Sequence, residues 1–211
     1  MIRRHQLRSW LVRAVAVAFS DDRAAQLVEF AVSLPLLVVF VVGIFDFSGA
    51  YTLKQKLTNA ARDAARAAAA DPANDLAQPT SIPASVSDAF QQVDNYLIAN
   101  KIDDCGMLST LYTSGPAASW KFSITPSGSS TCGITLIINR GYFFPAVASA
   151  RPANVDCLPP APTGAQIQVI ATCVSIKYAY QWRFGRVVSL LGPSASLPTN
   201  IVGTAVVMNE N

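Results

Sequence analysis

One stretch near the start of the chain is apolar on all sides, and it predicts a membrane-spanning helix. Between Glu29 and Asp46 there is no charged residue. At 1.5 Å per residue this interval covers about 24 Å, and the flanking turns bring it close to the roughly 30 Å hydrocarbon core of a bilayer. We therefore expect one span over residues 27–47, with a local kink at Pro35 and close approach of a neighbouring helix at Gly43. The alternative is a buried core helix of a soluble protein, which an all-round apolar surface disfavours.

The helical pattern continues beyond Asp46 as a narrow stripe of leucine and alanine. The stripe follows i, i+3, i+4, i+7 spacing from Leu53 to Ala68, while Arg62 and Arg66 lie one turn apart on the polar side. A proline at position 72 ends the helix, because it disfavours helical backbone in the residue before it. The stripe is expected to pack against the C-terminal part of the same chain, against helices of other copies, or against both on different faces.

The rest of the chain predicts a β-rich domain. Residues 72–85 read as a proline-rich linker, and a short amphipathic helix is expected at 86–99, capped by Ser85 or Ser87. The hydrophobic period then changes to two, which predicts strands. We place these strands at 120–125, 134–142, 167–180 and 201–208, with a short helix or loop at 181–196.

The predicted fold class is therefore α+β. A long N-terminal helix, transmembrane in its first half and amphipathic in its second, packs on a small C-terminal antiparallel β-sheet domain. The expected organisation is a leader at 1–24, the long helix at 25–71, the linker at 72–85 and an extracytoplasmic β-rich domain at 86–211.

Composition supports a membrane segment and argues against nucleic acid. Apolar residues make up 51% of the chain and charged residues only 14%, which is low for a soluble domain. The net charge is +3, but the basic residues are spread along the chain and form no patch interleaved with aromatic residues. Nucleic acid is therefore not an expected partner.

The four cysteines all follow the apolar run, and their spacing favours disulfides. No two of them form a CxxC pair, and the gaps are too irregular for a standard zinc site. A translocated domain would lie in an oxidising compartment, so two disulfides are expected, ahead of buried thiols and of a redox or metal role. The pairing stays open. The four residues are Cys105, Cys132, Cys157 and Cys173.

The basic N-terminus allows two interpretations. It could be a secretory signal cleaved after the triplet 16–18, but Arg13 interrupts its weakly apolar core. We favour a leader that stays in the cytoplasm and precedes the membrane anchor. Basic residues on the two sides of the span barely decide its orientation, whereas the expected disulfides place the C-terminal domain outside. The prediction is N-in, C-out.

The residues give little support to an enzyme. The one histidine, His5, lies in the leader, and no nucleophile, zinc-protease or phosphate-binding motif is visible. Asp103 and Asp104 have no matching ligand cluster and are interpreted as a solvated turn. We therefore expect no catalytic residue, no metal and no cofactor. A secreted enzyme with an uncleaved anchor is the least favoured class.

Glu29 is the residue with the strongest functional implication. A carboxylate at the edge of a membrane span is costly unless it is satisfied. In an intact chain Arg23 or headgroup water could satisfy it. In a chain cut before Ala25, Glu29 would lie near the start of the helix, where the dipole favours an acid, and could pair with the amine of a neighbouring subunit. The plainer alternative is an interfacial acid that marks where the membrane begins.

Residues 23–31, 34–37, 43–47 and 59–67 together resemble the TadE-like family in order and spacing. Their sequences are RAAQLVEFA, LPLL, GIFDF and NAARDAARA. The family consists of minor pilins, or pseudopilins, of tight-adherence (Tad/Flp) pili. The resemblance covers about residues 23–68, with a weaker likeness at 203–208.

The resemblance implies processing by a prepilin peptidase between Ala24 and Ala25, which would make Glu29 the fifth residue of the mature chain and an assembly residue. The usual residue before the cut is glycine, so Ala24 is a departure that puts cleavage in question. The implied location of the protein is the bacterial inner membrane. In an assembled pilus the implied location is the cell surface. The implied partners are the lipid bilayer, the peptidase, other pilin subunits and the Tad inner-membrane platform.

The resemblance also implies which residues form the span, and one alternative function stays open. Phe30, Pro35, Gly43 and Phe45 are the transmembrane positions that match the family pattern. The implied function is a structural or assembly role in a pilus that supports adhesion or secretion. The alternative is a single-pass envelope receptor or adhesin, in which the β-rich domain binds a ligand.

Overall fold

The computed structural model describes residues 22–72, 76, 82–109, 112–115, 118–125, 131–145, 156–157, 168–183, 185 and 197–210. The chain divides into two units, with the boundary between Phe47 and Ser48. This boundary falls inside a helix, so each part of that helix is described with its own unit.

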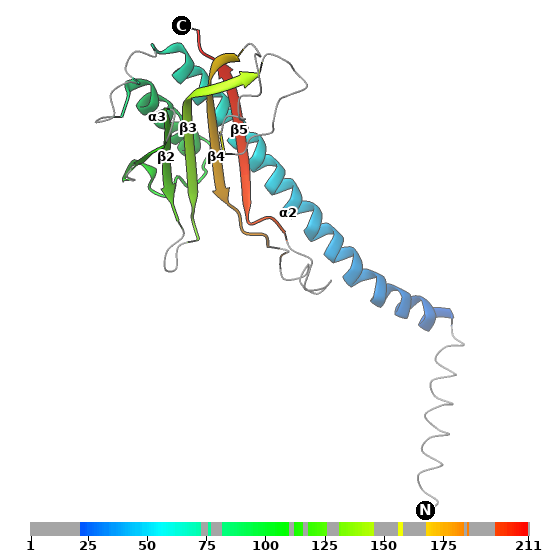
Figure 1. Ribbon diagram of the computed structural model, residues 1–211. Helices are drawn as coiled ribbons and strands as arrows, with labels where there is room; N and C mark the ends of the chain where they lie inside the picture. Colours follow the sequence, from blue (N-terminus) through cyan, green and yellow to red (C-terminus); the bar gives the residue numbers. More distant parts are fainter. Residues whose placement is uncertain are drawn as a thin grey trace, which may run out of the picture. The chain divides into compact units, whose positions relative to one another are not determined.

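The longest element is helix α2, Asp22–Ala70 (Figure 1). Leucine, alanine, lysine and arginine favour helix along its length, and Pro35 is accommodated inside it. The helix ends at Ala70, just before the Asp71-Pro72 pair. The prediction of one continuous helix through the apolar run and the alanine stripe is confirmed.

The second unit contains a five-stranded sheet in which every neighbouring pair is antiparallel and the spatial order follows the sequence (Figure 1). The predicted strands at β2 to β5 are confirmed, with ends that differ by at most three residues. The first strand was not predicted, because its sequence YTSG is too short to show alternation. The strands are β1 Tyr112–Gly115, β2 Ser119–Ile124, β3 Ile134–Pro145, β4 Gln168–Ala179 and β5 Asn200–Met208.

The helices of this unit cover one face of the sheet. Side chains alternate between the two faces of a strand, so Leu136 and Ile138 of β3 point to the same side as Ile176 of β4. These residues are fully buried in one cluster with the alanine stripe of α2 and the apolar face of α3. The opposite face carries a second, smaller cluster around Tyr142 and Cys173. The α+β fold class is therefore confirmed.

Helix α3, Ala84–Ala99, occupies the predicted helical segment but starts differently. The expected cap at Ser85 or Ser87 is wrong, because Pro83 is the N-cap and no side chain caps the helix. Pro83 accepts hydrogen bonds at its carbonyl from the backbone N–H groups of Val86 and Ser87, at 3.1 and 3.0 Å. Proline has a fixed φ and is tolerated at the start of a helix.

Several expectations fall outside the described residues. The leader up to residue 21, most of the linker at 72–85 and most of the segment 181–196 belong to this group. The predictions made for them stay predictions.

Candidate functional site

The first unit presents an apolar helical surface. The side chains of Leu27, Phe30 and Phe45 are 70%, 62% and 75% exposed. From Ala25 onward α2 is long and apolar enough to cross a membrane, and its most apolar window has no buried residue within the described structure. A contiguous exposed apolar surface of this size needs a lipid or protein partner.

The predicted site residues of this unit lie along α2 in the expected order. Glu29 is exposed near the start of the apolar run. Pro35 lies inside the helix, and two residues before it the Ser33 hydroxyl donates to the Phe30 carbonyl at 3.3 Å. A Cβ built on Gly43 would meet no heavy atom within 4 Å, so the described structure leaves room at this position.

The proposed cleavage point lies at the beginning of the same helix. Ala24 and Ala25 both belong to α2, which begins at Asp22. The roles of Ala24, Ala25 and Glu29 stay predictions.

Asp46 is an acid that the sequence marked only as the end of the uncharged run. Its flanking residues Phe45 and Phe47 are 75% and 55% exposed, whereas Asp46 itself is 5% exposed. Asp46 is therefore a buried acid in an otherwise exposed apolar part of the helix, and it joins Glu29 as a residue of functional interest. Its position inside the matched motif GIFDF was the available sequence signal.

In the second unit, the alanine stripe of α2 packs on the sheet of its own chain. Leu57 and the alanines at 60, 61, 64, 65 and 68 are all fully buried in the main core cluster. The helix and the sheet approach closely at Gly203 of β5, where an added Cβ would lie 2.5 Å from the Leu57 carbonyl carbon and 2.5 Å from the Thr58 nitrogen. The stripe is therefore filled within the chain, and of the two predicted uses the intramolecular one is confirmed.

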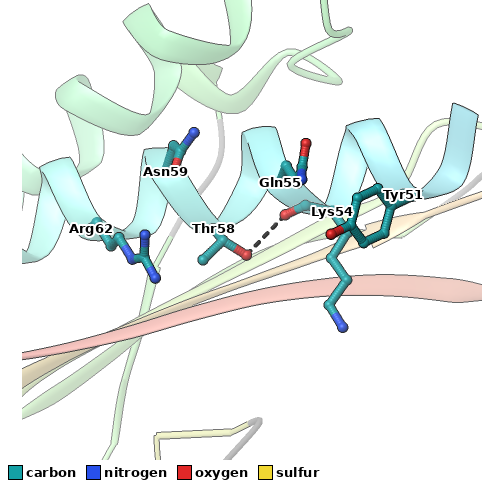
Figure 2. A pocket seen from close by; sticks show the side chains of 6 residues that line it. All are labelled: Tyr51, Lys54, Gln55, Thr58, Asn59 and Arg62. Carbon is teal, nitrogen blue, oxygen red and sulfur yellow. Dashed lines mark hydrogen bonds between the residues drawn. The ribbon is translucent and has the colours of Figure 1, made fainter. Parts of the chain in front are cut away.

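The opposite side of this helix segment is polar. Figure 2 shows six side chains that project from successive turns and line a shallow hollow. The Thr58 hydroxyl donates to the Lys54 carbonyl at 2.8 Å. Arg62 and Arg66 are exposed, as the periodicity predicted. The lining residues are Tyr51, Lys54, Gln55, Thr58, Asn59 and Arg62.

The far end of α2 is held by an arginine from the sheet. Arg140 of β3 is fully buried, and its guanidinium donates to the Asp71 carbonyl at 2.8 Å. The register of β3 with β4 shifts between Asn139 and Tyr142, which places Arg140 at an irregularity in the strand. The helix dipole favours a cation at a C-terminus, so this contact stabilises the end of α2. The signal in the sequence was a charged residue inside a largely apolar strand.

All four predicted cysteines form disulfides, and the structure decides the pairing left open by the sequence. Cys105 pairs with Cys132 and Cys157 with Cys173, with Cα atoms 5.5 and 5.6 Å apart. The first bridge ties the loop after α3 to the start of β3. The second lies on the sheet face opposite the helices.

Acidic residues gather at the loop after α3. The Asp103 carboxylate accepts the Cys105 backbone N–H at 2.9 Å. Burial raises the pKa of the Asp94 carboxyl, and the charge and hydrogen bond of the neighbouring Asp104 carboxyl raise it further. Asp103, Cys105 and Cys132 lie close enough to share an ion, but both sulfurs are bonded to each other and are not thiolate ligands.

The comparisons with known proteins connect the chain to one family. The family model described as TadE-like protein matches residues 24–66. This match confirms the resemblance found in the sequence, and it covers the exposed apolar part of α2 and most of the buried stripe. No curated protein and no solved structure matches the chain. The β-sheet and both disulfides lie outside the matched segment.

Proposed function

We propose that this chain is a minor pilin or pseudopilin of a Tad-type pilus. It is inserted in the inner membrane through the apolar part of α2, with the disulfide-bonded domain outside. It contributes to assembly, initiation or the tip of the pilus through helix packing and not through catalysis. Its partners are the bilayer, a prepilin peptidase, other pilin subunits and the inner-membrane platform.

The observation that carries this proposal is the division of α2 into two differently used parts within the TadE-like match. Residues before Phe47 present exposed apolar side chains, whereas the stripe from Leu57 onward is covered by the chain's own sheet. The buried stripe is already occupied by the chain's own domain, so the apolar surface that α2 offers to lipid and later to other subunits lies in its first half. This arrangement supports a subunit that exchanges lipid contacts for helix contacts.

Processing is tested by the N-terminal residue of the mature protein. Mass spectrometry of membrane and sheared-surface fractions should give a chain that begins at Ala25. A start near Phe19 would indicate ordinary secretion. An intact Met1 or Ile2 would indicate a membrane protein that is not processed, with Ala24 at the cleavage position as the reason.

Assembly is tested by Glu29→Ala, with Glu210→Ala as the matched control. Glu210 is an exposed acid at the other end of the chain, so its removal changes the net charge equally. We expect pili to be lost in Glu29→Ala and retained in Glu210→Ala, because only Glu29 is available to pair with a subunit amine in an apolar surrounding. Normal pili in both variants would favour the single-pass receptor or adhesin.

A further inference from the structure

An aromatic edge of the second unit, formed by Tyr180, Trp182 and Arg183, follows directly after β4. Helix α2 runs alongside β5 in the same direction, since Gly203 lies against Leu57 and the Glu210 backbone N–H donates to the Ala69 carbonyl at 3.4 Å. The start of β5 and the end of β4 therefore lie toward the N-terminal end of this helix segment.

The ring of Tyr180 is fixed beside the first residues of the unit. Its hydroxyl lies 3.2 Å from a Cβ built on Gly49. The ring packs edge-on against Trp182, with centroids 5.0 Å apart and planes at 80°. The Trp182 indole N–H donates to the Pro198 carbonyl at 2.6 Å, and the Tyr180 backbone N–H donates to the Thr199 carbonyl at 2.9 Å. The aromatic edge is thus anchored at its backbone and at its indole.

Gly49 lies just after the expected membrane span in the sequence, so the aromatic edge beside it is expected near the membrane surface. Gly49 follows Phe47, the last apolar residue of the expected span, by two positions in the sequence. Tyr51 in the next turn is 64% exposed, and Lys54 and Arg183 are exposed cations. Tyrosine and tryptophan concentrate at the membrane–water interface, and long cationic side chains reach the headgroups.

We propose that the aromatic edge lies in the phospholipid headgroup layer and fixes the height of the folded domain on the membrane. The proposal rests on the membrane insertion of α2 in the proposed function. The occupant is the bilayer itself.

The chain offers an internal probe with a matched control. Its three tryptophans are Trp10, Trp120 and Trp182, and Trp120 is 6% exposed in the core. The full chain carrying Trp10→Phe and Trp120→Phe is reconstituted into phosphatidylethanolamine–phosphatidylglycerol vesicles, with nitroxide labels on the headgroup or deep in the acyl chain. We expect the headgroup label to quench Trp182 emission more strongly than the deep label. Trp120, isolated by Trp10→Phe and Trp182→Phe, should lose little emission with either label.

A charge-reversal pair, made in the same Trp10→Phe and Trp120→Phe background, gives a second measurement. Arg183→Glu and Arg66→Glu change the same charge at exposed sites, but Arg66 lies about 26 Å along α2 from Gly49. One cation near an anionic surface contributes about 1 kcal/mol, so Arg183→Glu should lower the docked population at least about fivefold. Arg66→Glu should leave Trp182 quenching unchanged.

The outcomes separate this proposal from the proposed function. Protein that resists alkaline extraction but shows no headgroup quenching of Trp182 would overturn the docked edge and leave the anchor standing. Protein that alkaline carbonate removes from the vesicles would overturn the anchor, and the docked edge with it.

Discussion

Gly203 has no Cβ, and this allows strand β5 to lie close to helix α2. An added Cβ would lie 2.5 Å from backbone atoms of Leu57 and Thr58, and neither backbone can rotate away. The residue is therefore required by packing and not by backbone conformation.

We predict that Gly203→Ala destabilises the second unit by about 1–3 kcal/mol, because α2 must move away from β5. Thermal unfolding of the full chain in detergent would measure the loss. Gly43→Ala is the control, since an added Cβ there meets nothing within 4 Å. An unchanged midpoint for Gly203→Ala would contradict the close helix–strand contact.

Asp94 makes the stability of the domain depend on pH. The carboxyl is 3% exposed and its pKa is raised by burial and then by Asp104. A raised folded-state pKa means that the folded state binds the proton more tightly than the unfolded chain does. Its contribution is fully present below the unfolded pKa and is lost as pH rises through the folded pKa.

The melting temperature should therefore decrease as pH rises through the folded-state pKa of Asp94, and Asp94→Asn should reduce this decrease. At neutral pH the variant should be more stable than the parent, because a neutral amide replaces a buried carboxylate. Asp88→Asn, at an exposed position of the same helix, serves as the control. A pH profile that Asp94→Asn leaves unchanged would contradict this account.

At the scale of elements, α2 is stabilised at its end by Arg140 and along its length by the sheet. The Arg140 guanidinium donates to the carbonyl of Asp71, the residue that follows α2, and the Asn209 side chain donates to the Arg140 carbonyl at 3.2 Å. Helix end, strand β3 and the segment after β5 thus meet at one buried residue.

Arg140→Met should cost about 2–3 kcal/mol of unfolding free energy, since it removes a charged donor from a buried carbonyl. Arg66→Met removes an exposed cation from the same helix and should stay within about 0.5 kcal/mol of the parent. Denaturant unfolding of both variants compares the two effects. Equal stability of the two variants would show that Arg140 does not hold the helix end.

At the scale of the molecule, the chain joins an apolar helix segment to a folded unit that has its own core. The main cluster of buried residues draws on α2 after Ser48, on α3 and on the sheet, and two disulfides close the loops of this unit. The folded unit does not need the apolar segment to complete its core.

A fragment that begins at Ser48 should therefore fold as a soluble, oxidised monomer, whereas the full chain requires detergent. Size-exclusion chromatography and a thiol assay under denaturing conditions would check this, with no free thiol expected. Aggregation of the oxidised fragment would contradict the division of the chain at Ser48.

The sequence by itself determined the elements whose signals are local. The uncharged run from Glu29 to Asp46, the alanine stripe and the period-two segments each carry their pattern within a short window, so the long helix and four of the five strands could be predicted. The family match at 24–66 rests on the same local pattern. Strand β1 was missed, because four residues of mixed polarity carry no period.

Only the tertiary structure decided which surfaces are used and which residues meet. The covering of the alanine stripe, the pairing of the cysteines, the contact of Gly203 with Leu57 and the capping of α2 by Arg140 all join residues far apart in the sequence. Such contacts depend on how the helix crosses the sheet, and many crossings satisfy the same hydrophobic pattern. The physical reason is that the hydrophobic effect favours any arrangement that buries apolar surface. Close packing and buried hydrogen bonds are satisfied in only one of these arrangements.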